Sequence, residues 1–268
     1  MAEIAQISGD ELQVIAGREG FDFTQLMQDY YVTAIVFLLK DIEGIHFKGG
    51  TALQKIFLNH TRLSEDADYT VSTDIDKLRK PIEKRIKESR LFQEVTKDKD
   101  VKGYLRLVAH YRDPFGDKGT VFIDLNSRAS LVLKPERNNV SHFYEGYIPA
   151  FSVSTLALKE LIAEKVAAAI ARNQPRDHFD IYQIIRHDLP IDMKLVEKKC
   201  RSSGDEFNII RMFDKAKTLK NRWDKDLLPL VREEVPFETV MKTLAKRFDL
   251  AGEKKRLRNL NAKMAQVH

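Results

Sequence analysis

The sequence predicts an α+β protein, in which a mixed-sheet domain is followed by an all-helical C-terminal domain. Two observations predict this fold class. Strand-like segments are interspersed with helical ones up to Pro149, and helical patterning dominates from Thr155 onward. Such a change is typical of an α+β domain joined to a helical one. We place the boundary near residue 150, which gives domains of residues 1–150 and 151–268.

The first domain is predicted to contain a long helix over residues 21–39, where apolar side chains recur at spacings of three and four. A short strand at 45–48 follows, and Gly49-Gly50 turns the chain into a helix over 52–58. In order, the remaining predicted elements of this domain are a strand at 66–71, a helix at 76–89, and strands at 104–112 and 120–126.

Residues 113–119 join the last two strands and are rich in turn-forming residues, which indicates a compact connection. Nearly all of the second domain is predicted to be helical, because its apolar residues follow helical spacing between polar breaks. The predicted helices of this domain cover residues 156–172, 176–187, 192–200, 206–219 and 237–249.

The composition fits a folded protein of a reducing compartment. Hydrophobic residues make up 43% and charged residues 32% of the 268 residues, which excludes a disordered chain. The longest apolar run, near Thr33–Leu39, is far too short to span a bilayer, and no secretory signal is visible. The lone Cys200 cannot form an intrachain disulfide. We therefore expect a cytoplasmic protein with no membrane partner.

The net charge of +5 and the isoelectric point of about 9.1 are compatible with binding nucleotides or nucleic acid. Basic residues crowd one predicted helix and the C-terminus. Each cluster fits either a solvated helix face or a surface that follows phosphates. The first cluster is Lys77, Arg79, Lys80, Lys84, Arg85, Lys87 and Arg90, and the second is Lys254, Lys255, Arg256, Arg258 and Lys263.

Asp66 and Asp68 stand two residues apart in a predicted strand, so their side chains point to the same face. Neighbouring carboxylates repel each other unless a cation lies between them, and such oxygen ligands suit Mg²⁺ or Mn²⁺. Asp124 lies in a second predicted strand. If the two strands are neighbours, the three acids form a two-metal cluster of the kind that serves phosphoryl transfer.

Gly49, Gly50 and Thr51 stand where a strand turns into a helix. Glycine lets backbone amides approach an anion, the helix N-terminus is positively polarised, and Thr51 offers a hydroxyl. We expect these residues, with Ser64 beside the metal acids, to bind nucleotide phosphates. A glycine turn alone, or an acid pair alone, is common in structural roles. Their combination in this order is far more specific.

The Gly-Gly-Thr turn followed by Arg-x-Ser-Glu-Asp-x-Asp, within residues 49–68, resembles the signature of AbiEii-type nucleotidyltransferase toxins. This MenT-like family belongs to the DNA-polymerase-β-like superfamily of minimal nucleotidyltransferases. Residues 164–182 are similar to the family's second motif, and residues 223–237 to its C-terminal tryptophan element. The resemblance runs in the family's order over about residues 48–240. It implies that the mixed-sheet domain is a polymerase-β-like nucleotidyltransferase domain.

Carried over to this chain, the family's roles imply that Asp66 and Asp68 bind metal and that Lys165 contacts the nucleotide phosphates. Asp180 matches the essential acid of the second motif, and Asp124 matches the third acid of the wider fold. All five are therefore candidate catalytic residues.

Lys165 and Arg172 are seven residues apart and share a helix face, and Asp177 and Asp180 share a face of the next helix. We include Arg172 and Asp177 among the candidate nucleotide-binding residues. The alternative is an ion-pair network that joins the two helices.

The resemblance implies an enzyme of the EC 2.7.7 class that moves a nucleoside monophosphate from an NTP to an acceptor with the help of Mg²⁺. It implies the 3′ end of tRNA as the acceptor, and a toxin of a type IV-like toxin–antitoxin system, with a cognate antitoxin, in phage defence. Two alternatives stay open: nucleotidylylation of a protein or small molecule, and a non-catalytic relative that binds nucleotide or RNA. In the mycobacterial MenT toxins an antitoxin kinase phosphorylates a hydroxyl near the position of Ser64, and phosphate here would add negative charge beside the metal acids.

Overall fold

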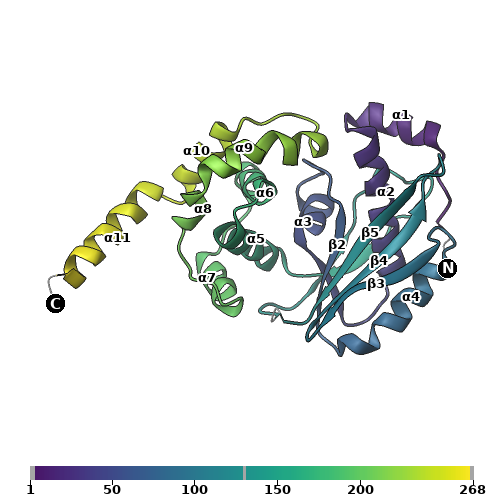
Figure 1. The fold of residues 1–268 in the computed structure, drawn as a ribbon, viewed down its shortest axis with the longest axis horizontal. Coiled ribbons are helices and arrows are strands. Elements are labelled where there is room, and N and C mark those ends of the chain that lie inside the picture. The colour runs from purple at the N-terminus through teal and green to yellow at the C-terminus, as the bar shows by residue number, and fades with distance from the viewer. Residues whose placement is uncertain (1–3, 129–130, 266–268) are drawn as a thin grey trace. The chain divides into compact units, whose positions relative to one another are not determined.

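The computed structural model describes residues 4–128 and 131–265, and the chain divides into two compact units. Unit 1 is Met1–Leu161 with Pro229–Arg232, and unit 2 is Ile162–Leu228 with Glu233–His268. Unit 1 contains a mixed seven-stranded sheet and unit 2 is built from helices (Figure 1), so the predicted α+β class is confirmed. Of the helices that the structure describes, none combines the length and the apolar character needed to cross a bilayer.

The sheet has the strand order β3-β4-β5-β2-β1-β7-β6. β2 pairs in parallel with β5 and β1 with β7, while the other neighbouring pairs are antiparallel. Strands β1, β2, β4 and β5 lie where the sequence predicts them. The seven strands are β1 Ile45–Lys48, β2 Asp66–Val71, β3 Glu94–Val101, β4 Tyr104–Arg112, β5 Lys118–Asn126, β6 Glu136–Asn139 and β7 Ser152–Thr155.

The sequence does not predict β3, β6 or β7. β3 and β6 form the two edges of the sheet, and their residues are largely exposed and charged or polar. Edge strands carry such residues because charge discourages pairing with other chains, and this removes the apolar alternation that marks a strand. β7 has four residues, of which only Val153 is apolar.

Two helices of unit 1, α2 and α4, cover one face of the sheet (Figure 1). Before α2, the unpredicted helix α1 is capped by Ser8, whose side chain forms a capping box with Glu11. The helical segments of unit 1 are α1 Gly9–Glu19, α2 Phe23–Leu39, α3 Gly49–Ala52, the π-helical η1 Leu53–Phe57, the 3-10 turn η2 Ile75–Lys77 and α4 Arg79–Glu88.

The covered face is identified by Tyr31 of α2, whose ring stacks on Tyr111 of β4 with centroids 3.5 Å apart. Arg106 lies five residues before Tyr111 on the same strand, so its side chain points to the opposite face. The basic cluster of α4 lies on the covered side, where Ile82 and Ile86 are buried and the lysines are exposed. For this cluster a solvated helix face is therefore the better interpretation.

A buried ion pair joins α2 to η1. Lys55 donates hydrogen bonds to both carboxylate oxygens of Asp29, at 2.8 and 2.7 Å, and a third to Thr33 Oγ1 at 2.8 Å. The Tyr144 hydroxyl also donates to Asp29, at 3.1 Å. Lys55 and Asp29 are each 1% exposed. Because η1 follows the Gly49-Gly50 turn and α3 in the chain, this ion pair fixes the segment on the C-terminal side of the turn.

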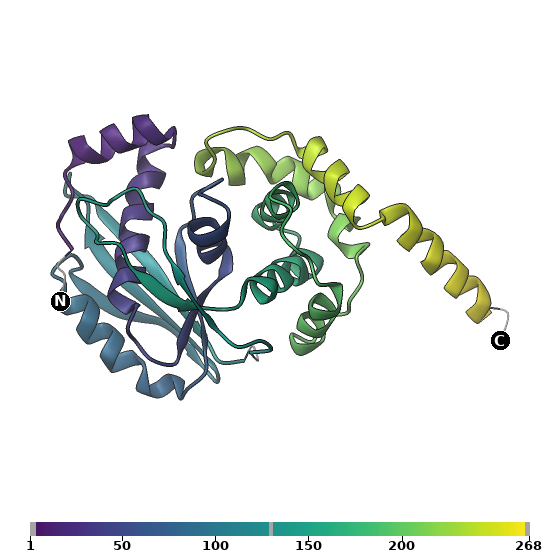
Figure 2. The ribbon, with the colours of Figure 1, turned by 180° about the vertical axis from the view of Figure 1, so that it is seen from behind.

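In unit 2, α6 packs against both α9 and α10, and Trp223 of α9 donates to the Val235 carbonyl just before α10 at 2.9 Å. The last helix, α11, projects away from the other helices of its unit (Figure 2), and Lys263 lies beyond the last residue whose side chain is described. The helices are α5 Leu158–Arg172, which begins in unit 1, α6 Pro175–Arg186, α7 Met193–Ser202, α8 Arg211–Asp214, α9 Ala216–Leu227, the 3-10 turn η3 Leu228–Leu230, which crosses between the units, α10 Phe237–Arg247 and α11 Leu250–Ala265.

The predicted single helix over residues 206–219 is wrong. The chain makes the short α8 and breaks at Lys215, and α9 then runs on to Leu227. The prediction failed because residues 206–210 carry apolar side chains at helical spacing but form a loop that buries Ile209.

Candidate functional site

The paired acids stand at the start of β2, and the strand carrying the third acid is its direct neighbour. β2 and β5 are parallel, and Asp68 is in register with Asp124. Asp66, Asp68 and Asp124 are half-buried. The residue between the first two on β2, and both neighbours of Asp124 on β5, are fully buried. The alternation places all three acids on the face of the sheet that α2 does not cover.

Asp124 is held by two side chains of the next strand, β4. Arg106 donates from Nε to Oδ1 at 2.7 Å and from Nη2 to Oδ2 at 2.8 Å, and the Tyr104 hydroxyl donates to Oδ1 at 2.9 Å. These hydrogen bonds raise the pKa of Arg106 above its ordinary value, so the guanidinium stays charged. Among the residues that the structure describes, no group of three His, Cys, Asp or Glu side chains is placed to hold a metal ion.

The turn from β1 into α3 lies against the acids. Gly49 has φ of +75°, and a Cβ at this position would overlap the carboxylate of Asp68. Thr51 is fully buried, and its hydroxyl donates to the Asp66 carbonyl at 2.5 Å and lies 2.8 Å from Ser64 Oγ. This hydroxyl therefore ties the helical turn to the start of β2, and the predicted contact of Thr51 with a nucleotide phosphate stays a prediction.

Substituting Gly49 with alanine is expected to destabilise unit 1 by about 1–3 kcal/mol and to weaken metal binding, because the new methyl group is strained at positive φ and displaces Asp68. Urea unfolding and Mn²⁺ titration measure the two effects. Gly20→Ala is the matched control, since Gly20 has φ of +73° and a Cβ there would meet no atom within 4 Å. If both variants bind Mn²⁺ equally, the close approach to Asp68 has no functional consequence.

A hollow of about 450 Å³ opens beside Asp66. Its walls come from α2, the residue before β2, β2 itself, β4 and β5, and the ring of Phe122 lies under the guanidinium of Arg106, 5.0 Å away. An aromatic ring beside a charged group suits a nucleotide, which offers both a base and phosphates. The lining residues are Gln28, Glu65, Asp66, Arg106, Thr120 and Phe122.

In unit 2 the structure brings the residues of the second motif into a buried ion-pair network. Lys165 of α5 lies 2.9 Å from Asp177 and 2.8 Å from Asp180 of α6, and Arg172 donates to Asp177 from Nε at 2.7 Å and from Nη2 at 2.9 Å. Lys165 is 7% exposed and the two acids 1% or less. Burial by itself would raise the pKa of Asp177, but Lys165 and Arg172 outweigh it and hold this pKa well below its ordinary value.

The depressed pKa of Asp177 predicts a dependence of stability on pH. A carboxylate whose pKa is lower in the folded than in the unfolded chain stabilises the fold fully above the unfolded pKa, which is about 3.9. This stabilisation decreases below that pH and is lost only as the pH falls through the lower pKa of the folded chain. Asp177→Asn is expected to cost about 3 kcal/mol at pH 7, and progressively less as the pH falls below about 4.

Urea unfolding of both proteins at several pH values measures this difference. Asp226→Asn, which removes a partly exposed partner of Arg222 in the same unit, is the control and is expected to cost less than about 1 kcal/mol. A penalty for Asp177→Asn that does not change with pH would contradict the ion-pair explanation.

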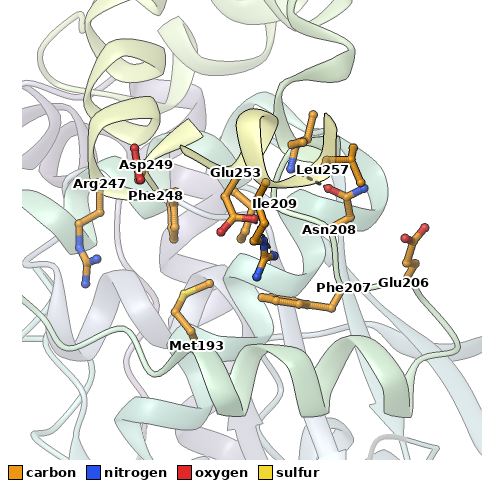
Figure 3. A pocket seen from close by; sticks show the side chains of 12 residues that line it. Met193, Glu206, Phe207, Asn208, Ile209, Arg247, Phe248, Asp249, Glu253 and Leu257 are labelled. Carbon is orange, nitrogen blue, oxygen red and sulfur yellow. Dashed lines mark hydrogen bonds and ion pairs between the residues drawn. The ribbon is translucent and has the colours of Figure 1, made fainter. Parts of the chain in front are cut away.

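A second hollow, of about 680 Å³, lies wholly within unit 2 (Figure 3). Met193 and Phe207 lie on one side of it, and Phe248 and Leu257 on the other. Its lining mixes acidic, basic and apolar side chains and includes none of the candidate site residues. We therefore assign it no part in the candidate site.

Sequence reasoning missed Arg106 and Tyr104, although both strands of their hairpin are predicted. The antiparallel register pairs Arg112 with Lys118 and Arg106 with Asp124, so partners lie at equal distances from the middle of the turn. Counting outward from residue 115 would have paired Arg106 with Asp124.

A family model described as the nucleotidyl transferase AbiEii toxin of type IV toxin–antitoxin systems matches residues 39–250. No curated protein matches the chain.

Three solved structures are similar in fold. MenT4, a nucleotidyltransferase toxin from Mycobacterium tuberculosis H37Rv, superposes with a TM-score of 0.66 at 18% identity, covering 93% of this chain and 92% of its own. JHP933 from Helicobacter pylori has a TM-score of 0.58 at 19% identity, with 91% and 99% covered. A putative nucleotidyltransferase from H. pylori gives 0.58 at 19% identity, with 90% and 99% covered.

Proposed function

Because this chain belongs to the AbiEii family of nucleotidyltransferase toxins of type IV toxin–antitoxin systems, we propose that it moves a nucleoside monophosphate from an NTP to the 3′ end of tRNA in a Mg²⁺-dependent reaction. Family membership makes it a nucleotidyltransferase of the EC 2.7.7 class and a toxin. The acceptor, the metal and the residues that act are our proposal. Since NTPs and tRNA are found in the cytoplasm, we propose that it acts there, opposed by a cognate antitoxin.

The observation that carries the proposal is the pair Asp66 and Asp68 on one half-buried face of β2, against the Gly49 turn. Mg²⁺ commonly binds proteins through one or two carboxylates and completes its coordination with substrate phosphates and water. Two carboxylates therefore suffice for a metal that arrives with an NTP. When bound, the metal would neutralise the triphosphate and make the attacking hydroxyl more acidic.

The chain's own residues would hold and orient the reactants. The backbone amides around Gly49 and Gly50 are proposed to bind a phosphate, because glycine has no side chain of its own to block the approach. The hollow beside Asp66, with Phe122 and Arg106, is proposed to receive the nucleotide. In the transfer, the acceptor hydroxyl oxygen bonds to the α-phosphorus, the bond to the bridging oxygen of pyrophosphate breaks, and the hydroxyl proton passes to water.

For the second motif we keep the family's roles as proposals, with Lys165 contacting phosphate and Asp180 as an essential acid. Lys165 forms ion pairs with Asp177 and Asp180. To contact a nucleotide, its ammonium group therefore has to replace one of these carboxylates with a phosphate oxygen as its partner. Arg172, whose side chain is 60% exposed, retains Asp177 during such an exchange.

The decisive experiment incubates the purified protein with Mg²⁺, total tRNA and each α-labelled NTP in turn, beside the Asp66→Ala variant. Label in the tRNA band that disappears with the variant supports the proposal, and the NTP that works identifies the donor. Label in a protein or a small molecule, with none in tRNA, would overturn the acceptor. A purified wild-type protein that labels none of these acceptors would contradict the proposed activity.

Regulation through Ser64 is a further part of the proposal. Ser64 lies 2.8 Å from Thr51 Oγ1 and two residues before Asp66, and β2 begins at Asp66, so Ser64 precedes the strand. A phosphate there would bring a charge of about −1.5 to −2 beside the acids and repel the triphosphate. Mass spectrometry of protein co-expressed with its partner tests this idea, and an unmodified Ser64 in a silenced enzyme would exclude it.

A further inference from the structure

The position of Asp124 makes it the next carboxylate available to a cation at the acid pair. Its Cα is the register partner of that of Asp68 on the neighbouring strand, about 4.8 Å away in a typical sheet. Both residues lie on the same face. A metal that used all three acids would therefore need no rearrangement of the sheet.

The side chain of Asp124, however, is already committed. Nε and Nη2 of Arg106 each donate a hydrogen bond to one carboxylate oxygen of Asp124, and the Tyr104 hydroxyl donates a third. Such bidentate pairs are among the strongest hydrogen bonds in proteins. Arg106 is fixed in turn by the ring of Phe122 below it, with the guanidinium carbon 5.0 Å from the ring centroid.

The charges give this arrangement a consequence for metal binding. Arg106 offsets one of the three negative charges of the acids. A divalent ion that binds Asp124 therefore has to displace the guanidinium of Arg106. We propose that Arg106 is a built-in counter-cation of Asp124, which competes with divalent metal for this carboxylate. The resting chain then binds metal through Asp66 and Asp68 without Asp124, and this inference rests on the metal pair of the proposed function.

The test is a titration of the full-length protein with Mn²⁺ in the absence of NTP, with bound metal measured by calorimetry or by the electron paramagnetic resonance of free Mn²⁺. Arg106→Gln is expected to bind Mn²⁺ at least tenfold more tightly than the wild type, or to bind a second ion. Asp124→Asn alone is expected to weaken binding by less than tenfold, because Asp124 is not a ligand in the resting chain and only the charge of Arg106 is left uncompensated. The double variant is expected to return to the wild-type affinity.

Two further variants separate the possible failures. Arg106→Lys keeps the positive charge and is expected to bind Mn²⁺ nearly as the wild type does, so it controls for changes in folding. Asp66→Ala is expected to lose the ion altogether.

If the wild type binds Mn²⁺ through Asp66 but Arg106→Gln binds it no more tightly, the role of Arg106 is refuted and the metal pair stands. A tenfold loss with Asp124→Asn alone refutes it as well, since Asp124 would then be a resting ligand. If neither the wild type nor Arg106→Gln binds Mn²⁺, the metal pair and this inference both fall.

Discussion

Replacing Asp66 with alanine is expected to lower nucleotide transfer by about a thousand-fold or more while leaving the fold intact. The loss is large because the charge that develops on the phosphates in the transition state would no longer be neutralised by a metal held in place. The fold is expected to survive because the side chain of Asp66 is only half-buried, and its removal relieves repulsion from Asp68.

Initial rates with labelled NTP measure the effect of Asp66→Ala, and a thermal melt measures the fold. Asp76→Ala is a suitable control, because this exposed acid lies in η2, outside the candidate site. It is expected to retain full activity. A melting temperature of the Asp66 variant lower by more than about 5 °C would instead make the acid a structural residue.

Replacing Lys55 with methionine is expected to destabilise the protein by about 3–5 kcal/mol, which is the largest stability effect that the structure predicts. The change leaves the carboxylate of Asp29 buried without its cation, and an uncompensated buried charge costs far more than the intact pair contributes. Burial also lowers the pKa of Lys55, against the opposing influence of Asp29, so the ammonium depends on this partner for its charge.

Urea unfolding measures the effect of Lys55→Met. Lys84→Met, in the exposed face of α4, is the control and is expected to change stability by less than about 0.5 kcal/mol, because its contact with Glu88 is 3.8 Å long and solvated. The double variant Asp29→Asn/Lys55→Met is expected to recover part of the loss, since no buried charge then remains. If Lys55→Met is as stable as the wild type, the attraction between Lys55 and Asp29 does no more than offset the cost of burying the two charges.

The sequence alone was enough for the local features. β1, β2 and β4 were predicted at their observed positions, and Asp66 and Asp68 were placed on one face of β2, because strand alternation is a property of consecutive residues. The fold class followed from the order of such segments, and the family from the resemblance of the motifs within residues 49–68, 164–182 and 223–237. The edge strands β3 and β6 escaped prediction, because their polar residues lack the alternation that burial imposes on central strands.

Only the tertiary structure decided what each polar side chain contacts. It directed the hydroxyl of Thr51 to a carbonyl and enclosed Lys165 between two carboxylates. It also joined Asp29 to Lys55, which are 26 residues apart in the chain. Such contacts depend on which strands and helices become neighbours. The pattern of apolar residues determines which face of each element is buried, but it carries little information about the partners of the polar side chains.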